Sequence, residues 1–388
     1  MKPGTGIPIR GMGVVSALGT GTPRNVKSIR AKRDGLTPLT LFPHPGMEHV
    51  SACSIPELPA DRERRCDELA LVAIVEALED AGLAPGSPEL QECALLLGNT
   101  SVDLLEQETR SRLEPSSLPL IRQGAIVGNL ADRLAARVGI GGPVLAYNTG
   151  CSASANALHQ GLQLLWTGRV ERVLVVGVDS LTATSLYGFT ALALLDPDGC
   201  RPFDRDRQGI QLGEGAAAVL IDRGVAPPGT DPSQDPVLLA GVNVFDAHHP
   251  AASSPDGSAG ATAMQSALQR AGVEAGRIAG VKAHGTGSSN NDLAEARSLS
   301  RVFGAAIPPF TSLKRYVGHT MGASGILELV VFVGCIRSGF IPATLGFATN
   351  DPEFEAAPLA DHRSANGGVF LFNSFGFGGS CVSLVLQV

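Results

Sequence analysis

Short aliphatic runs alternate along the chain with segments whose apolar residues recur at helical spacing. The strand-like runs include PIRGMGVVSAL from residue 8, CALLLGNTS from residue 93 and VERVLVVGVDS from residue 170, and the helical pattern ELALVAIVEALEDAGL lies between the first two. This alternation predicts a mainly parallel sheet with helices on both faces. The continuous run VLVVGV is typical of a strand that is covered on both sides.

The pattern begins again after residues 223–236, RGVAPPGTDPSQDP, which have no apolar period. We interpret this segment as a linker between an N-terminal half, residues 1–222, and a C-terminal half, residues 237–388. The order around Cys151 (lead-in, Gly, reactive residue, small residues, helix) recurs around His319 in TSLKRYVGHTMGASGILELVVF. We therefore expect an internal duplication in which these two residues occupy matching places at the starts of matching helices.

The composition favours a compact globular protein. Apolar residues make up 44% of the 388 positions and charged residues 17%, and the formal net charge of -7 argues against a nucleic-acid partner. We expect no signal peptide, because Pro8 and Arg10 interrupt the N-terminal apolar residues. We expect no membrane span either, because the most apolar later stretch, GILELVVFVGCI, is short and carries Glu328.

The cysteines indicate a reducing compartment. There are 7 of them, an odd number, scattered and without a C-x-x-C pair, so neither a disulfide framework nor a zinc site is signalled. We expect a cytoplasmic protein without a bound metal ion.

The stretch YNTGCSASANALHQGL places Cys151 between a glycine and small residues, directly before a helical pattern. Backbone N–H groups at a helix N-terminus favour the thiolate, which is the nucleophilic form of cysteine. The competing interpretation is an inert buried side chain, because free cysteine is among the most buried residue types. Residue type alone favours the second interpretation.

A second candidate is His284 in VKAHGTGSSNNDLAEA, where an apolar run changes to polar residues and glycines. This pattern places the imidazole at a strand end, where side chains usually face a site, although a core histidine fits equally well. Asp292 and Glu295, three residues apart, resemble a capping box at the start of the next helix.

Two further segments carry candidate chemistry. Lys314 lies five residues before His319, and Glu328 lies nine after it, so the two form a buried ion pair that orients the imidazole unless Lys314 is simply exposed. The loop LFNSFGFGGS, residues 371–380, either bends sharply and offers backbone N–H groups as an oxyanion hole or is only a glycine-rich turn.

Taken in order, four motifs resemble those of the elongating β-ketoacyl-[acyl carrier protein] synthases, which use one Cys and two His. They are Cys151 in its small-residue turn, HGTG, K-x-x-x-GH-x-x-GASG and NSFGFGG, and RPFDRDRQGIQLGEGAAAVL at residues 201–220 matches a further family segment. The resemblance covers more than half of the chain. It implies the α/β thiolase fold, in which two duplicated halves pack as five α/β/α/β/α layers.

The resemblance also implies a reaction, a decarboxylative condensation of an acyl chain with malonyl-carrier protein. Cys151 would hold the acyl chain, and His284 and His319 would donate to the thioester oxygen of the malonyl group. Lys314 with Glu328 would hold His319 in place. The backbone N–H groups of Cys151 and Phe375 would bind the oxyanion, and the Phe375 ring would gate the acyl pocket.

The remaining implied residues fall into three sets. Asp292 supports the site together with Glu328 and Phe375. The residues expected to contact the pantetheine arm are Thr286, Ser288, Phe375, Gly376 and Phe377. The arginines expected to dock an acidic acyl carrier protein are Arg62, Arg64, Arg65, Arg201, Arg205 and Arg207.

The family implies no cofactor, because the carrier protein brings its own phosphopantetheine, and it implies a homodimer or a heterodimer with a chain-length factor. Nucleic acid and membrane are not expected partners. The rival classes are a degradative thiolase and a non-catalytic chain-length factor. The thiolase needs a second cysteine where this chain has Asn373 and Ser374, and the chain-length factor lacks the nucleophile that this chain keeps.

Several positions depart from the family pattern. Gly150 stands in place of Ala, Ser288 in place of Thr, and Ser380-Cys381 in place of Thr-Asn, and residues 30–60 look shortened. None of these changes removes a catalytic group. Together they favour a divergent branch, such as a polyketide or aryl-polyene synthase, and they leave the acyl chain length open.

Overall fold

The computed structural model describes residues 6–55, 58, 64–101, 127–224 and 235–388. Two sets of five strands share one order in space, with chain positions 3-2-4-5-1: β6-β5-β7-β8-β1 in the N-terminal half and β11-β10-β14-β15-β9 in the C-terminal half. A short antiparallel pairing of Ile7 with Leu238 and Pro8 with Val237 joins the two sets. The predicted duplication is therefore visible in the topology.

The bounds of these strands follow from the backbone pairing. In the N-terminal half they are β1 (Ile7–Ser16), β5 (Cys93–Gly98), β6 (Val144–Tyr147), β7 (Arg172–Asp179) and β8 (Gly215–Asp222). In the C-terminal half they are β9 (Val237–Phe245), β10 (Ile278–Lys282), β11 (Phe310–Thr311), β14 (Val369–Gly376) and β15 (Ser380–Gln387). Three short pairings involve β2 (Gly19–Thr20) with β1, β3 (Thr37–Pro38) with β4 (Ser51–Ala52), and β12 (Phe340–Ile341) with β13 (Arg363–Ser364).

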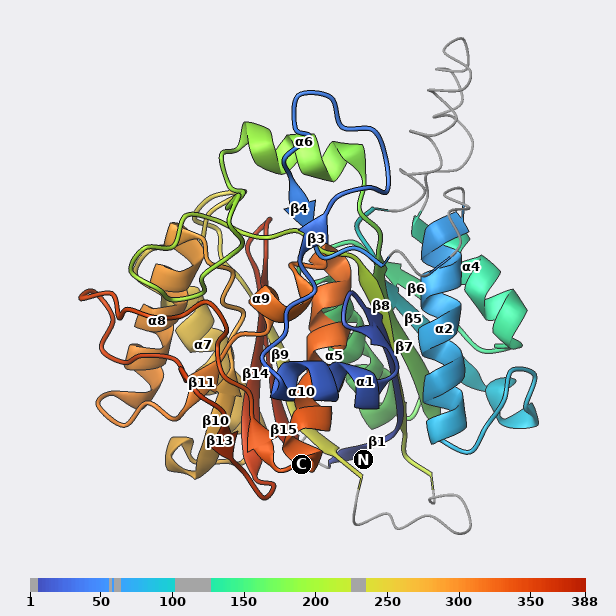
Figure 1. Cartoon of the computed structure of the whole chain (residues 1–388). Helices are drawn as coiled ribbons and strands as arrows, with labels where there is room; N and C mark the ends of the chain where they lie inside the picture. Colours follow the sequence, from blue (N-terminus) through green and yellow to red (C-terminus); the bar gives the residue numbers. More distant parts are fainter. Residues whose placement is uncertain (1–5, 56–57, 59–63, 102–126, 225–234) are drawn as a thin grey trace.

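The helices form the other layers of the fold. Their bounds are α1 (Thr22–Arg30), α2 (Arg65–Asp80), α4 (Val127–Val138), α5 (Ala153–Trp166), α6 (Ala183–Ala191), α7 (Ser258–Ala271), α8 (Ser289–Phe303), α9 (Lys314–Val317) and α10 (Ser324–Arg337). Helices α5 and α10 lie between the two sheets, α2 and α4 cover the outer face of one, and α7 and α8 cover that of the other (Figure 1). These are the five layers that the resemblance implies.

The prediction of a mainly parallel sheet is wrong. In each half two strand pairs are parallel and two are antiparallel: β7 and β1 run antiparallel to β8, and β14 and β9 run antiparallel to β15. The apolar run VLVVGV is buried on both faces as expected, yet β7 pairs parallel with β5 and antiparallel with β8. Burial on both faces here reflects the helix layers on each side, which cover antiparallel strands equally well.

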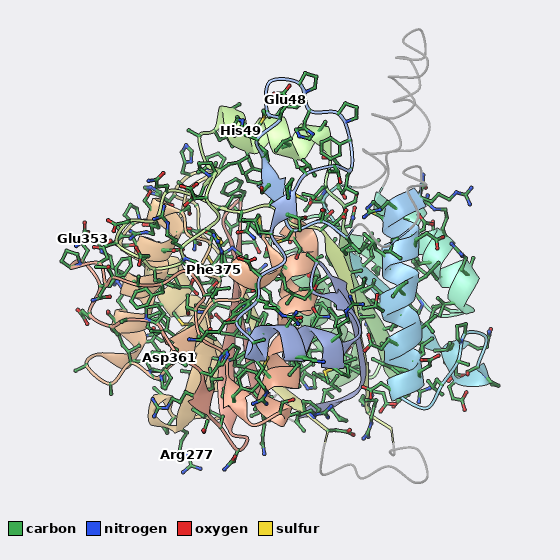
Figure 2. The ribbon with its side chains drawn as sticks, in the orientation of Figure 1. Glu48, His49, Arg277, Glu353, Asp361 and Phe375 are labelled. Atoms are coloured by element: carbon green, nitrogen blue, oxygen red, sulfur yellow. The ribbon has the colours of Figure 1, made fainter. Side chains whose placement is uncertain are left out.

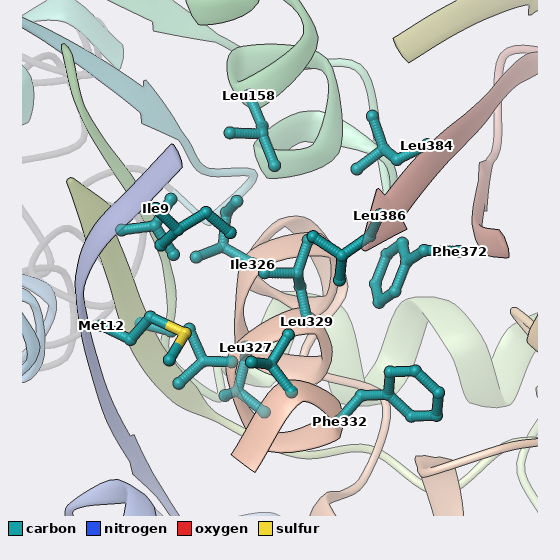
Figure 3. Close-up of a cluster of buried hydrophobic side chains, with 14 of the residues drawn as sticks. Ile9, Met12, Leu158, Ile326, Leu327, Leu329, Phe332, Phe372, Leu384 and Leu386 are labelled. Carbon is teal, nitrogen blue, oxygen red and sulfur yellow. The ribbon is translucent and has the colours of Figure 1, made fainter. Parts of the chain in front are cut away.

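The central helix α10 explains how the two sheets share one core. Its residues from Ser324 to Ile336 are all buried, as expected for a helix that is apolar on every side. Figure 3 shows its side chains between Leu158 of α5, Ile9 and Met12 of β1, and Phe372 of β14. Each such aliphatic or aromatic side chain contributes about 1.5–3 kcal/mol by leaving water. This packing fixes the position of Glu328, which also lies on α10.

Small residues let the two central helices approach closely at their N-termini. The backbone N–H of Ile326 donates to the Ser154 hydroxyl at 3.1 Å. A Cβ added to Gly325 would lie 2.5 Å from the backbone nitrogen of Ala155, so no larger residue fits there. The segments that precede α5 and α10 are therefore brought to the same place between the sheets.

Most of the predicted linker, residues 225–234, lies outside the described residues, so the predicted division into halves stays a prediction. No helix in the described part of the chain is both long and apolar enough to cross a bilayer.

Candidate active site

One cavity brings the four sequence motifs together between the two halves of the fold. Its lining includes the three expected reactive residues, Cys151, His284 and His319. The residues predicted to contact a pantetheine arm line it as well, namely Thr286, Ser288, Phe375, Gly376 and Phe377. The interpretation of Cys151 as an isolated inert residue therefore loses its support.

Cys151 lies two residues before α5 and directly after Gly150, whose backbone conformation is one that residues other than glycine rarely adopt. Gly150 has φ +59°, and a Cβ there would lie 2.9 Å from the carbonyl oxygen of Phe377. Cys151 is itself 7% exposed. Burial raises the pKa of its thiol to about 11, although the Lys314 charge and the backbone N–H of Phe377 oppose this rise. The prediction that the resting side chain is a thiolate is wrong, because the loss of solvation on burial raises the thiol pKa by more than the N-terminus of α5 lowers it.

Two neutral imidazoles line the same cavity as this thiol. The rings of His284 and His319 are nearly perpendicular, at 82°, with centroids 5.5 Å apart. Burial, followed by the positive charge of Lys314, lowers the pKa of both well below the usual 6.5. Each ring therefore carries a single N–H, and the Nδ1 of His319 lies 3.1 Å from the Ser324 hydroxyl.

Cys151 and His319 do not occupy equivalent positions before their helices. Cys151 precedes the first residue of α5, Ala153, by two positions, whereas His319 precedes the first residue of α10, Ser324, by five. A 3-10 turn, Met321–Ala323, fills the difference. The predicted match of the two segments is thus correct in order but shifted in register.

The buried ion pair of Lys314 with Glu328 is present, but it serves the other histidine. The Lys314 ammonium donates to the backbone oxygen of His284 at 3.1 Å and lies 3.5 Å from its Nδ1. It also pairs with Oε1 of Glu328, and both side chains are 0% exposed. The expectation that Lys314 and Glu328 hold His319 is therefore corrected: Lys314, which is paired with Glu328, contacts His284.

Asp292 and Glu295 do not form a capping box. Ser288 is the N-cap of α8, and its side chain makes no capping hydrogen bond. Asp292 instead accepts hydrogen bonds from the backbone N–H groups of Thr286 at 2.9 Å and Gly287 at 3.0 Å. Glu295 accepts from those of His284 and Gly285, each at 2.8 Å. The two buried carboxylates hold the HGTG loop in place, so the supporting role expected for Asp292 has a structural basis.

The pantetheine candidates Thr286 and Ser288 place their hydroxyl oxygens 2.9 Å apart at the cavity wall. A hydroxyl pair at this position suits the amides of an extended substrate arm, which offer both donors and acceptors. Replacement of the family's threonine by Ser288 keeps the hydroxyl.

The NSFGFGG loop lies directly against the nucleophile turn. A Cβ on Gly376 would lie 2.8 Å from the backbone oxygen of Thr149, so β14 approaches the turn as closely as a backbone allows. Phe375 is 5% exposed, and its ring centroid lies 6.0 Å from that of His284. In Figure 2 Phe375 lies within the outline of the molecule, whereas Glu353 lies at its left edge.

Two backbone N–H groups lie beside the Cys151 thiol, that of Phe377 and that of Cys151 itself. Phe375 lies within the β14–β15 ladder, opposite Cys381. The structure therefore favours Phe377 over the predicted Phe375 as the donor to an oxyanion. The Phe377 ring is 39% exposed and stands 6.0 Å from that of Phe189, centroid to centroid, at the cavity mouth.

The departures at residues 380 and 381 have different surroundings. The hydroxyl of Ser380 accepts from the Asn156 side-chain amide at 2.8 Å and donates to Asn243, which connects β15 to α5 and β9. Cys381 is 4% exposed and lines the cavity. Burial raises the pKa of its thiol to about 12, so a neutral side chain occupies this wall.

Two of the predicted docking arginines are structural. The Arg65 side chain is 3% exposed and bonds Glu214. Arg207 is 7% exposed at the side chain, pairs with Asp351 at 2.6 Å and lies over the Phe354 ring. Neither side chain offers its charge to a carrier protein, because both side chains are buried in the fold.

The other docking candidates remain at the surface or outside the described chain. Arg64 is exposed, and Arg62 lies outside the described residues. The side chain of Arg205 is 55% exposed beside Asp206, and that of Arg201 is 30% exposed and 3.6 Å from Asp196.

Two residues important to this site were not singled out from the sequence. Asp179, at the end of β7, accepts from the backbone N–H groups of Ser101 at 2.7 Å and Gly322 at 2.6 Å. It thereby ties the turn after His319 to the end of β5. The sequence signal for this role was an acidic residue, Asp179, directly after the apolar run VLVVGV. The second residue, Lys282, shares Glu328 with Lys314.

The cavity offers a nucleophile and hydrogen-bond donors. No group of three or more His, Cys, Asp or Glu in the described part of the chain is arranged to hold a metal ion. All seven cysteines are free and buried.

Three solved structures that share this fold are a ketosynthase/chain length factor, a type II polyketide ketosynthase and a β-ketoacyl synthase. The ishigamide ketosynthase/chain length factor has a TM-score of 0.88 and 28% identity, with 99% of each chain covered. A β-ketoacyl synthase from Burkholderia phymatum has a TM-score of 0.86 and 26% identity over 98% of each chain. A type II polyketide ketosynthase solved in complex with its acyl-carrier protein has a TM-score of 0.89 at 22% identity over 100% of each chain, a likeness of fold. The class is that of the thiolase-fold condensing enzymes.

Sequence comparison agrees with the structural one. The family model for the N-terminal domain of β-ketoacyl synthases matches residues 51–225, and the model for the C-terminal domain matches residues 237–348. The chain belongs to the β-ketoacyl synthase family, whose members are acyltransferases that condense acyl thioesters.

Curated relatives carry related names. Nodulation protein E of Rhizobium leguminosarum bv. trifolii is 28% identical over 98% of each chain. The 3-oxoacyl-[acyl-carrier-protein] synthase 2 of Mycobacterium bovis is 33% identical over 64% of this chain and 61% of the relative. The enzyme of the same name from Synechocystis sp. is 27% identical over 98% of this chain and 97% of the relative.

Proposed function

We propose that the protein condenses an acyl chain held on Cys151 with a malonyl group delivered by an acyl carrier protein, with loss of carbon dioxide. One observation carries the proposal. A buried thiol and two neutral imidazoles line a single cavity, and a backbone N–H lies beside the sulfur. This set supplies a nucleophile, two donors for an enolate oxygen and a donor for an oxyanion.

The first half-reaction is acyl transfer. The Cys151 sulfur attacks the carbonyl carbon of the acyl thioester, and the carrier's sulfur leaves with the proton that the thiol gives up. Because the resting thiol is protonated, a base must take this proton, and the neutral imidazole of His284 or His319 is the available acceptor. The backbone N–H of Phe377 stabilises the oxyanion that forms on the way.

The second half-reaction forms the carbon–carbon bond. The bond between the carboxylate and the α-carbon of the malonyl group breaks, carbon dioxide leaves, and the electron pair becomes an enolate. The N–H groups of His284 and His319 stabilise the enolate oxygen. The α-carbon then attacks the acyl-Cys151 carbonyl, the thiolate is expelled, and a proton from solvent restores the thiol. Lys314 positions His284 through its backbone oxygen.

The carrier protein supplies the phosphopantetheine arm, so the enzyme needs no cofactor of its own. Thr286 and Ser288, whose hydroxyl oxygens lie 2.9 Å apart at the cavity wall, would contact the arm, and Gly376 lines the same cavity. Arg64, Arg201 and Arg205 remain the candidates for steering an acidic carrier. An enzyme with this substrate and free cysteines belongs in the cytoplasm.

A second copy of a ketosynthase-like chain would cover the edge of the sheet. Strand β6 is the last strand of the N-terminal set, and among the described residues it pairs only with β5. Leu145 on this edge is 40% exposed. An apolar edge strand favours pairing with another chain. We infer a homodimer, or a heterodimer such as the ketosynthase/chain length factor found among the structural neighbours.

The test uses purified protein with acyl- and malonyl-carrier protein. Intact-protein mass spectrometry should show an acyl adduct on the enzyme that is absent in Cys151→Ala, followed by a β-ketoacyl-carrier product and released carbon dioxide. An adduct that persists in Cys151→Ala would overturn the role of the nucleophile. Condensation of acyl groups without loss of carbon dioxide would point to a degradative thiolase. The lengths of the products would place the enzyme in fatty-acid or polyketide synthesis.

A further inference from the structure

Lys282 is a buried lysine next to the reactive residues that the mechanism above does not use. It is the last residue of β10, two positions before His284, and it is 1% exposed. Its ammonium pairs with Oε2 of Glu328 and lies 4.1 Å from the centroid of the Phe372 ring. Lysine is almost never fully buried without a partner, and each of these contacts supports a charged form.

Glu328 is therefore shared by two lysines, one on each carboxylate oxygen. Lys314 takes Oε1, Lys282 takes Oε2, and all three side chains are at most 1% exposed. With both lysines protonated, the formal charge of the trio is one positive unit. A single carboxylate between two ammonium groups leaves each ammonium incompletely neutralised, so the surplus charge acts on its surroundings.

The surplus charge faces the two imidazoles. Lys282 contributes to the lowered pKa of both His284 and His319, after burial and the larger effect of Lys314. The other charged group that acts on Lys282 is Glu295, the carboxylate that holds the backbone of His284. The trio thus lies beside the two imidazoles whose N–H groups stabilise the enolate oxygen.

We propose that Lys282 is a positioning residue that sets the charge of the active site: by holding the second oxygen of Glu328, it directs Lys314 toward His284 and keeps positive charge beside the two imidazoles. This inference rests on the proposed decarboxylative condensation. Positive charge disfavours protonation of either imidazole and stabilises the enolate. Replacement of Lys282 by a neutral residue leaves Glu328 with one partner and makes the remaining pair formally neutral.

The protonation state of Lys282 offers a direct readout. Burial lowers the pKa of its ammonium to about 8, with the charge of Glu328 acting in the opposite direction. Lys282 therefore loses its proton as the pH rises through about 8. The surplus charge is lost in that pH range.

The experiment measures carbon dioxide release from malonyl-carrier protein by enzyme already acylated on Cys151, in a single turnover that excludes the thiol step. The wild-type rate should fall as the pH rises through about 8. Lys282→Met should be roughly tenfold slower at pH 7, about 1.4 kcal/mol in activation free energy, with little change in KM and no step near pH 8. Lys282→Arg, which stays charged, should keep its rate beyond pH 8.

Lys27→Met is the matched control, because Lys27 lies exposed on α1. A Lys282→Met enzyme with the wild-type rate and pH profile would overturn the proposal. So would a slower enzyme whose rate still falls near pH 8, because another group would then titrate there. Circular dichroism and acylation of Cys151 separate this effect from misfolding, since a charge effect leaves both intact.

If Lys282→Met does not fold, Phe372→Leu decides the question. This variant keeps the charge but removes the ring that the ammonium faces, so Lys282 should lose its proton more easily and the step should move to lower pH. A step that stays in place, or a wild-type profile without one, counts against the role of Lys282. Wild-type enzyme that releases no carbon dioxide at any pH would instead overturn the proposed function.

Discussion

The Lys314 ammonium donates to the backbone oxygen of His284 at 3.1 Å, although His319 is only five residues away along the chain. The lysine lies at the start of the single helical turn α9, which points it toward the end of β10. His319, on the far side of that turn, is held by its own contacts, among them the hydroxyl of Ser324. The two histidines are thus held by separate networks.

Replacement of Lys314 by Met should therefore impair decarboxylation more than acylation. The variant removes the donor to His284 and leaves Glu328 with Lys282 alone, so the loss should be on the order of 100-fold in the rate of carbon dioxide release. Stopped-flow measurement of carbon dioxide release and mass measurement of Cys151 acylation separate the two steps. Equal losses in both would show that Lys314 acts on the thiol rather than on His284. Lys32→Met, at an exposed ion pair with Asp361, is the control.

The Cys151 thiol should react slowly at neutral pH and increasingly fast above it. With a thiol pKa of about 11, the thiolate fraction rises about tenfold per pH unit from pH 7 to pH 9. Alkylation by a small neutral reagent should follow this rise without a plateau, with Cys151→Ala as the background for the other six cysteines. An alkylation rate that reaches a plateau between pH 6 and pH 8 would instead show that the N-terminus of α5 keeps Cys151 as a thiolate.

Gly150→Ala should destabilise the protein and slow its acylation. Gly150 has φ +59°, and an added Cβ would lie 2.9 Å from the backbone oxygen of Phe377, which moves the N–H that faces the sulfur. We expect a loss of about 1–2 kcal/mol in the free energy of unfolding.

Gly188→Ala in α6 is the matched control, because its Cβ would meet no atom within 4 Å. That change should be neutral or stabilising by about 0.5–1 kcal/mol. A Gly150→Ala enzyme as stable and fast as wild type would show that the turn adapts.

Asp292→Asn should loosen the HGTG loop. The carboxylate accepts from the backbone N–H groups of Phe203, Thr286 and Gly287, and an amide replaces one acceptor oxygen by a donor. A buried N–H without an acceptor costs about 1–3 kcal/mol. Chemical unfolding should show this loss, together with a raised KM for the malonyl substrate. Asp361→Asn, at the exposed pair with Lys32, should change neither quantity.

The motifs, through the family that they resemble, were sufficient to predict the layered fold and the reactive residues that line the cavity, but the apolar pattern alone predicted the strand directions wrongly. Strand ends and helix starts converge in a duplicated α/β fold, so a cysteine before one helix and histidines after strands meet without further information. The partners of those residues were not predictable in the same way. The short sequence distance between Lys314 and His319 predicted a contact between them. The direction of the single helical turn α9 instead brings Lys314 to His284.

The charged residues show the same limit. Arg65 belongs to a basic cluster in the sequence, yet it begins α2 on the side that faces Glu214 and is buried. Arg207 belongs to a family segment but stacks on Phe354. The thiol of Cys151 was predicted as a thiolate from the helix terminus, and the depth of its burial reversed that result. Because the burial of a residue depends on the whole fold, it is the property that local sequence patterns predict least well.

The two histidines should also make the stability of the protein depend on pH. In the folded chain the pKa of His284 and of His319 lies well below 6.5, whereas in the unfolded chain each titrates near 6.5. Below pH 6.5 the unfolded state therefore binds more protons than the folded state, and stability falls as the pH falls. At pH 5.5 the two histidines should therefore lower the free energy of unfolding relative to neutral pH.

This effect is measured by urea unfolding of wild type and of His284→Gln/His319→Gln at a series of pH values between 5.5 and 7.5. The difference between the two proteins isolates the histidines from buried acids such as Glu295, whose raised pKa acts in the opposite direction. Relative to the variant, wild type should lose stability only below pH 6.5. The decarboxylation rate of the folded wild type should stay constant over the same range, because neither ring gains a proton while the fold is intact. A rate that falls with a midpoint near pH 6.5 would contradict the buried, neutral state of the two imidazoles.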